Sequence, residues 1–586
     1  MSYLHAPRLS FAGKFFADPS TVDNNRNNFN LGVPLNQDPI GPNNNYGIGW
    51  NFQGTHVFRI EGGKVGSVDS GNGPVLSGDP LVGATVESVL DYYKYPAKLV
   101  DLDPDQQSVS AVWGLQLRVS IADPTNPATI LAGVSGLMPP TAFADMWTRV
   151  LGTLGGMSFF SAVFTSVLTN LKWIAPEKSP VLSELFKLSP DRLSLRLIVD
   201  SYQPRATSAT FRFGRVVGTI GPALAKEPVR YVGGRRLSAA ANPNTGSPAY
   251  GPVPAVVDGA NSRLLLDLGN FVPTKGPPGI AAVPPEGWPV RASDFELYVT
   301  TGPPAVPPSP HTTKSADIFV AAPPSTKLGS IHFDPADYTT AGGIKAVPLT
   351  KDQLALIADA PLSLIDVTAG GSTPAVAEDP SGLYVDVSEV VYRLEPGAAA
   401  TVALGAWKFG QRAAGVNLDL VIQPQGQPDP NNTPAAGLAF PASVTTEADG
   451  TAAVALKAGD PAGVRKDMNI DGQVYFLGGP WTNLGHIFPL QSAPINVLVF
   501  DNYPVPVNPT WAEHVGPILA YYAQVYPYMK TIIDLADRDT VIQNADAILY
   551  VLNLEVEHPH YMPVLRDLSA GKRQMLVNWL GSSDHI

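Results

Sequence analysis

Proline and glycine punctuate the whole chain, and this feature limits its possible folds more than any other. The 586 residues include 58 prolines and 54 glycines, which favour turns and interrupt regular elements. Between them, stretches such as residues 193–199 and 294–299 alternate apolar and polar side chains, which is the two-residue period of a half-buried strand. The sequence therefore predicts a mainly β protein made of many short strands joined by turns.

The composition excludes several classes of protein. Hydrophobic residues make up 44% of the chain, enough apolar surface to offset the entropy lost on folding. The net charge is −12 and no cluster of five or more basic residues occurs, so we expect no nucleic-acid partner. The absence of cysteine excludes disulfides, thiolate nucleophiles and cysteine-ligated metal centres.

The pattern of elements predicts a multidomain protein with three regions. Residues 1–394 form a β-rich N-terminal body with a helical insertion near residues 141–190. In residues 395–502, apolar and polar side chains alternate along short segments, which predicts an immunoglobulin-like β-sandwich. In residues 503–586 the apolar side chains recur at helical spacing, which predicts a short helical C-terminal segment.

One part of the predicted insertion raises the question of a membrane. Residues 150–171 carry no charged side chain and are long enough to cross a bilayer. Glycine, serine, threonine and asparagine dilute this stretch, which favours a buried or hinge helix and makes a membrane partner unlikely. A second, short helix is expected at residues 180–187. The first residues lack a signal peptide, so we expect a cytoplasmic location, and export by a route other than Sec remains an alternative.

Several helix starts are marked by capping residues. Thr350 begins one predicted helix, because Gln353 completes a capping box with it. Asn508, followed by a proline, begins the first helix of the C-terminal segment. Ser569 and Gly581 mark the start and the end of the last helix.

Aromatic residues of the C-terminal segment are the candidate partner-binding residues: Trp511, Tyr522 and Tyr526. Trp511 and Tyr522 belong to an apolar stripe that must be buried somewhere. If the stripe is left partly open, we expect it to bind a partner or a second copy through these anchors. If it packs on the sheets of its own chain, it belongs to the core.

The sharpest candidate metal site lies in the predicted sandwich. Asp467, Asn469 and Asp471 supply oxygen ligands at positions one, three and five of a calcium loop, and Gly472 takes position six. Position twelve is Gly478 rather than a bidentate glutamate. Two interpretations stay open: a truncated calcium loop, with calcium the one candidate cofactor, and a hairpin rich in Asx turns, which the spacing favours.

Histidines provide weaker candidates. Residues 555–560 place two imidazoles beside two glutamates, close enough to share a metal, although the proline between the histidines favours a loop at a helix end. His5 and His56 are possible haem ligands. A lone histidine in a β-rich chain is more often a hydrogen-bonded structural residue, and this interpretation is the favoured one.

The common catalytic motifs are absent. The sequence contains no Gly-x-Ser-x-Gly, no His-Glu-x-x-His, no P-loop and no Gly-x-Gly-x-x-Gly opening a helix. This weakens an assignment as an enzyme, and no catalytic or cofactor-binding residue is assigned from the sequence.

Segments spread along the chain resemble one family. Residues 520–529, 535–538 and 561–563 read Ala-Tyr-Tyr-Ala-Gln-Val-Tyr-Pro-Tyr-Met, Leu-Ala-Asp-Arg and Tyr-Met-Pro. They resemble the middle of the imine-dimer synthases of the violacein and rebeccamycin pathways, the chromopyrrolic-acid-synthase type proteins. Shorter matches follow the same order along the chain, at residues 79–84, 100–104 and 214–221.

The resemblance implies a role in the same kind of pathway, but not the coupling reaction that the family catalyses. In that family this portion precedes a ferritin-like domain with the metal or haem chemistry that couples two tryptophan-derived imines, and the present chain has no pair of Glu-x-x-His motifs for such a site. We therefore expect a non-catalytic binding or assembly subunit of secondary metabolism, acting with a separate ferritin-like or oxidase partner or as a homo-oligomer. Two alternatives remain: an enzyme acting on an aromatic imine-type metabolite, and a secreted or membrane-active interaction protein.

Overall fold

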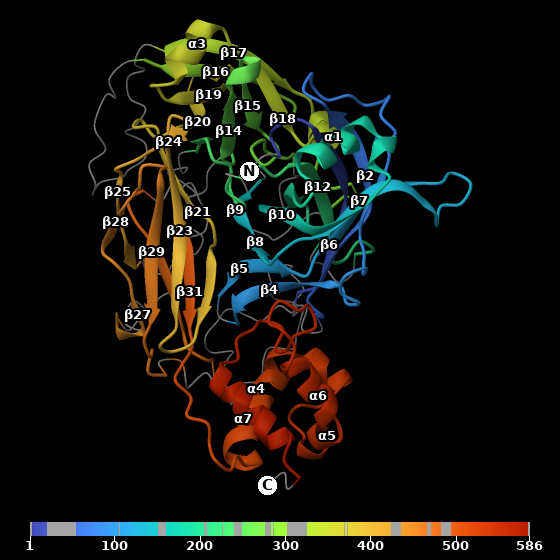
Figure 1. Cartoon of the computed structure of the whole chain (residues 1–586), viewed down its shortest axis with the longest axis vertical. Coiled ribbons are helices and arrows are strands. Elements are labelled where there is room, and N and C mark those ends of the chain that lie inside the picture. Colours follow the sequence, from blue (N-terminus) through green and yellow to red (C-terminus); the bar gives the residue numbers. More distant parts are fainter. Residues whose placement is uncertain are drawn as a thin grey trace.

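The structure is a computed structural model, and most of the chain is described in it. The described residues are 3–19, 54–104, 106–149, 160–203, 208–225, 227–239, 249–275, 283–284, 286–301, 325–368, 370–371, 373–422, 435–463, 465, 470–481 and 494–583. The protein is mainly β, as the sequence predicts, with several sheets and a helical C-terminal segment (Figure 1).

Eight strands in the described part of the N-terminal body form a sheet that closes on itself, called the closed sheet below. Its order is β1-β12-β11-β10-β7-β6-β3-β2, and β2 pairs back onto β1. Gly218 lies opposite Phe11 in the register, and the Phe11 ring occupies the space that a Cβ on Gly218 would need. The strands are β1 (Arg8–Ala17), β2 (Val57–Asp69), β3 (Thr85–Ser88), β6 (Gln116–Ala122), β7 (Ile130–Leu137), β10 (Phe160–Ile174), β11 (Leu193–Asp200) and β12 (Phe213–Pro222).

Short strands extend this sheet toward the rest of the molecule. β4 and β5 form a hairpin beside β2, β8 pairs with β5, and β9 pairs with β10. Their bounds are β4 (Ala97–Asp103), β5 (Gln106–Trp113), β8 (Thr141–Ala142) and β9 (Ala144–Thr148).

The helical insertion expected near residues 141–190 is wrong for most of its length. Among the described residues of this range, 141–142, 144–148 and 160–174 form strands, and the one α-helix is α1 (Pro180–Leu188), as expected for residues 180–187. Residues 161–168 pair along their whole length with β11, and this pairing outweighs the helical spacing of a few apolar residues. Residues 150–159 lie outside the described residues. No helix in the described part of the chain combines the length and apolar character needed to cross a bilayer.

Two four-stranded sheets, the central sheets, cover one side of the closed sheet and share a hydrophobic core. One contains β13 (Arg235–Leu237), β14 (Val253–Asp258), β15 (Arg263–Asp267) and β18 (Ile344–Pro348), and the other contains β16 (Ser293–Thr300), β17 (Ser325–Phe333), β19 (Leu362–Asp366) and β20 (Pro374–Ala377). Two helices, α2 (Pro335–Ala341) and α3 (Lys351–Ile357), connect them. The capping box predicted for α3 is confirmed: Thr350 Oγ1 accepts from the Gln353 N–H, and Gln353 Oε1 accepts from the Thr350 N–H.

The sandwich has two facing sheets whose inner side chains form one core. Its first strand begins at Leu383, ahead of the boundary predicted at residue 395, and β22 pairs with β31 in parallel. One sheet contains β21 (Leu383–Val387), β23 (Ala399–Lys408), β24 (Gln411–Arg412), β27 (Leu438–Ala439) and β29 (Thr451–Ala458). The other contains β22 (Val391–Leu394), β26 (Val421–Ile422), β30 (Gln473–Gly478) and β31 (Ile495–Val499), and β25 (Asn417–Asp419) pairs with β28 (Ser443–Thr445).

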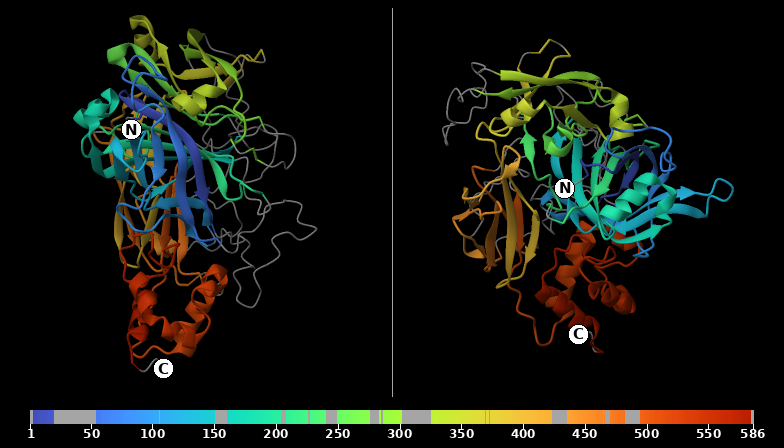
Figure 2. Two further views of the ribbon diagram at one scale, coloured as in Figure 1. Left: turned by 90° about the vertical axis from the view of Figure 1, so that its right-hand side faces the viewer. Right: turned by 45° about the horizontal axis from the view of Figure 1, so that its top comes forward.

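The C-terminal helices form a body at one end of the molecule, below the closed sheet and the sandwich in Figure 1 and in both panels of Figure 2. The first helix begins at Trp511, where Thr510 caps it, and not after Asn508 as predicted. The last helix is confirmed with its predicted ends, Ser569 and Gly581. The segment contains the π-helical turn Trp511–Val515, α4 (Gly516–Val525), α5 (Arg538–Gln543), α6 (Ala545–Leu552) and α7 (Ala570–Leu580).

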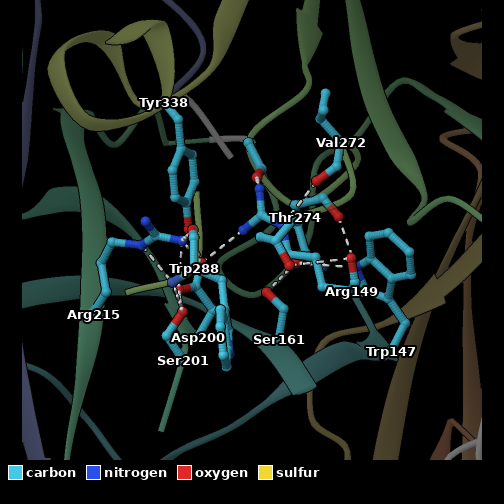
Figure 3. A network of polar contacts seen from close by, with 12 residues as sticks. Trp147, Arg149, Ser161, Asp200, Ser201, Arg215, Val272, Thr274, Trp288 and Tyr338 are labelled. Carbon is cyan, nitrogen blue, oxygen red and sulfur yellow. Dashed lines mark hydrogen bonds and ion pairs between the residues drawn. The ribbon is translucent and has the colours of Figure 1, made fainter. Parts of the chain in front are cut away.

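A buried network of ion pairs and hydrogen bonds joins the closed sheet to α2. Asp200, on β11, accepts hydrogen bonds from Arg149 at 2.8 Å, from Arg215 at 2.9 Å and from the Tyr338 hydroxyl at 2.6 Å (Figure 3). Burial opposes ionisation of Asp200, but Arg215 and Arg149 outweigh it and lower the pKa of the carboxyl. All its polar contacts are made inside the protein, so this network holds the fold together and is not a binding site.

Candidate functional site

A cavity of about 140 Å³ lies where the closed sheet, the central sheets and the sandwich meet, and it is partly open to solvent. Its walls come from segments far apart in the sequence: Asp145 on β9, Val163 on β10, Arg236 on β13, Tyr384 on β21 and Asn496 on β31. Cavities at the junction of structural units are common ligand sites, and this one is the candidate site of the protein.

Aromatic side chains form one side of the cavity. Tyr231 and Tyr384 line it, and both rings contact Trp407 behind them, with centroids 5.2 and 5.9 Å away. Trp481, also in the wall, donates its indole N–H to the Asp419 carbonyl at 2.7 Å. Because these rings are held by packing or by hydrogen bonds, they present a rigid apolar surface to a ligand.

Asp386 is a carboxyl group in the cavity wall with an unusual protonation preference. Its Oδ2 accepts from the Tyr384 hydroxyl at 2.6 Å, and its Oδ1 accepts from the Val387 N–H at 2.8 Å. Burial raises the pKa of Asp386, although Arg236 and the Tyr384 hydroxyl act in the opposite direction. The wall therefore contains a carboxyl that holds a proton more readily than an exposed aspartate does.

The charged groups of the wall are mostly neutralised inside the protein. Arg236 and Asp145 form a two-point ion pair. Burial alone would lower the pKa of Arg236, but Asp145 outweighs it and raises that pKa above its usual value. Arg235 is paired in the same way with Glu378. These pairs fix the strands that carry them and offer little charge to a ligand.

Arg230, unlike Arg235 and Arg236, is not paired with a carboxylate through two nitrogen atoms. Its Nη2 lies 2.9 Å from Glu389 Oε2, but its Nη1 is buried and has no hydrogen-bond partner. Burial lowers the pKa of Arg230, and Glu389 opposes this effect. A buried guanidinium nitrogen without a partner is rare in folded proteins, and here the residue lines a cavity.

A second cavity, of about 440 Å³, lies between the sandwich and the C-terminal helices and is lined by Asp460, Asp471 and Asp501. These carboxylates accept hydrogen bonds from backbone N–H groups. Asp471 also pairs with Lys572 at 3.3 Å. They therefore act mainly as structural acceptors in this cavity.

The predicted calcium ligands fall partly on this cavity. Asp467 and Asn469 lie outside the described residues, so calcium binding by them stays a prediction. Asp471 is described, and its contacts with Lys572 and the Ser569 N–H already satisfy it. In the part of the chain that the structure describes, no three histidine or acidic side chains lie together in a way that could hold a metal ion.

The interpretation of Trp511, Tyr522 and Tyr526 as exposed anchors is corrected. Tyr522 and Tyr526 are 6% and 7% exposed, and they belong to a core that joins α4 to Val100 and Trp113 of the β4–β5 hairpin. Trp511 is half-buried, with its ring 5.5 Å from that of Trp579. The stripe therefore packs on this chain's own sheet, the second of the two outcomes expected for it.

Two of the candidate histidines, His56 and His560, contact groups of the protein itself. His56 is buried, and its Nδ1 lies 3.0 Å from the Leu99 carbonyl. Burial lowers the pKa of His56 to about 4, with Lys98 acting in the same direction. His560 stacks on the Tyr95 ring with centroids 4.0 Å apart, so the segment 555–560 packs against aromatic rings.

Comparison with known proteins adds little. No family model and no curated protein matches the chain. Among solved structures, a Salmonella alpha-2-macroglobulin reacted with methylamine matches at 12% identity and a TM-score of 0.13, over 97% of this chain and 44% of that one. A TM-score of this size does not indicate a shared fold, and the chain spans less than half the length of that protein.

Proposed function

We propose that this protein is a non-catalytic binding subunit of secondary metabolism that holds a small molecule for a separately encoded catalytic partner, a ferritin-like protein or an oxidase, in the cytoplasm. The observation that carries the proposal is the cavity at the junction of three units. The resemblance of residues 520–529 to imine-dimer synthases supports the choice of pathway and of partner.

The size and lining of the cavity support binding of a small, ring-containing molecule. Its volume of about 140 Å³ is close to that of an engineered cavity of about 150 Å³ that holds benzene. Aromatic side chains with a few polar groups are the usual lining of a small-molecule site. The aromatic side chains are Tyr231, Tyr384 and Trp481. The polar groups are Asp386 and Arg230.

The pairing of the wall's charges favours binding over catalysis. Asp145 and Asp267 are held by Arg236 and Arg196, and a carboxylate held by arginine is a poor proton acceptor. A ligand can therefore be enclosed here without being changed.

A cavity-filling variant tests the proposal. Ala144 lines the cavity and is exposed, so Ala144→Phe places a ring in the cavity without disturbing the core. Ala453→Phe is the matched control, because Ala453 is also exposed, lies on β29 and does not line the cavity. Native mass spectrometry of protein purified from its own host should show a bound small molecule in the wild type and the control, and none in Ala144→Phe.

Partner capture is measured in the same preparations. We expect a ferritin-like protein or an oxidase to co-purify with the wild type, and a complex of this chain with itself alone would overturn the choice of partner. A wild-type protein that carries no small molecule, and that no single-ring compound stabilises against heat, would overturn the binding function.

One observation favours a second function, an enzyme acting on an aromatic imine-type metabolite. Burial raises the pKa of Asp386 in the cavity wall, and its Oδ2 accepts from the Tyr384 hydroxyl, so this carboxyl and hydroxyl are the candidate proton-transfer groups. In this case the purified protein alone would convert the bound molecule, and Asp386→Asn would abolish conversion while leaving binding intact.

A further inference from the structure

We infer that the cavity takes a small monoanion, a carboxylate on a single planar ring, and that Arg230 binds the carboxylate group. The inference rests on the proposed function, because it names the chemistry of the ligand in the same cavity. It starts from the unpartnered Nη1 of Arg230 in a residue that lines the cavity.

Comparison with the other arginines of the wall singles out Arg230 as the group that binds the carboxylate. Three described arginines line the cavity, and Arg236 and Arg235 each make two-point ion pairs with a carboxylate, Asp145 and Glu378. Arg230 uses only Nη2 for its carboxylate, Glu389. Its Nη1 is thus a charged donor for which the described protein supplies no acceptor.

A carboxylate fits this donor better than a neutral group or a more highly charged one. Hydrogen bonds between a guanidinium and a carboxylate are short and about twice as strong as those between neutral groups. A dianion would meet the repulsion of Glu389, which is already 2.9 Å from the same guanidinium. A single negative charge is therefore the best complement.

The rest of the wall limits the shape of the ligand. The volume of about 140 Å³ accommodates one ring. Tyr231 and Tyr384 are fixed against Trp407, so their rings offer aromatic surfaces on which a planar group can stack or pack edge-on. Benzoate has this combination of ring and charge, and phenol is a neutral probe with the same ring.

The test is isothermal titration calorimetry of the full chain with benzoate and with phenol. Arg230→Met should weaken benzoate about ten- to hundredfold, the usual cost of losing a hydrogen bond to a charged group, and should leave phenol nearly unchanged. Arg59→Met is the matched control, because Arg59 is partly exposed, pairs with Glu61, lies over the Phe16 ring and is not among the residues that line the cavity.

A second variant separates recognition from a structural role. Glu389→Gln keeps the Arg230 guanidinium and removes the carboxylate that competes for it. The affinity for benzoate should therefore rise at least about threefold. If Arg230 and Glu389 only hold the sandwich to the body, both variants would weaken both probes. Arg230→Lys keeps the charge if the methionine variant does not fold, and it should retain part of the preference for benzoate.

The outcomes distinguish the two proposals. Binding of phenol and benzoate with equal affinity, unchanged in Arg230→Met, would overturn the role of Arg230 and leave the binding function standing. Binding of neither probe, together with an empty cavity in protein from the native host, would overturn both.

Discussion

Acidification should weaken the docking of the C-terminal helices, because it protonates a histidine that the fold keeps neutral. His56 is buried, its ring lies edge-on to Tyr526 of the C-terminal segment at 5.7 Å, and its Nδ1 faces the Leu99 carbonyl. Burial lowers its pKa from 6.5 to about 4, with Lys98 and Arg566 adding to the effect and Asp18 opposing it. The folded protein therefore binds a proton at His56 much less readily than the unfolded chain does.

The size and sign of the effect follow from this difference. Because the folded pKa is the lower one, the stabilisation is complete above pH 6.5, is lost as the pH falls, and reaches its full loss below pH 4. Each unit of pKa difference corresponds to about 1.4 kcal/mol. Between pH 7 and pH 5, the contribution of His56 to the free energy of unfolding should therefore fall by about 2 kcal/mol.

Urea unfolding at pH 7 and at pH 5 measures this contribution. The wild type is compared with His56→Gln, which cannot be protonated, and with His332→Gln as a control, because His332 is exposed. The wild type and the control should lose about 2 kcal/mol more than His56→Gln between the two pH values. Equal losses in all three proteins would show that His56 does not cause the loss of stability.

Three other substitutions test the packing. Asp200→Asn leaves two buried arginines without their carboxylate and should cost about 3–5 kcal/mol in the free energy of unfolding, whereas the exposed Asp294→Asn should cost little. Gly218→Ala puts a methyl group into an aromatic ring and should cost about 1–3 kcal/mol; Gly259→Ala, with open space around it, should not. Tyr526→Ala should cost about 3 kcal/mol or more, because the ring is buried, and an unchanged melting temperature would favour a partner-binding role instead.

Local signals predicted local structure well. The capping box of α3 depends on two residues three positions apart, and both α3 and α7 begin where the sequence places them. The start after Asn508 was wrong because Thr510, two residues on, is also a capping residue, and its side chain accepts from the Glu513 N–H. Composition and alternation were enough to predict a mainly β protein.

Features that depend on distant parts of the chain were not predictable. Residues 160–174 carry apolar residues at spacings that fit either a helix or a buried strand, and pairing with β11 decides between them. Arg230, Arg236 and Asp386 form the cavity wall only because the sandwich folds against the N-terminal body. None of the three belongs to a recognisable motif in the sequence.

The most direct test of the ligand cavity is an experimental structure of the protein crystallised with benzoate. We expect the ring beside Tyr384 and Tyr231, with a carboxylate oxygen at hydrogen-bond distance, about 2.9 Å, from Arg230 Nη1. A cavity filled only by water, or benzoate bound elsewhere while Arg230 Nη1 meets another group of the protein, would contradict this expectation.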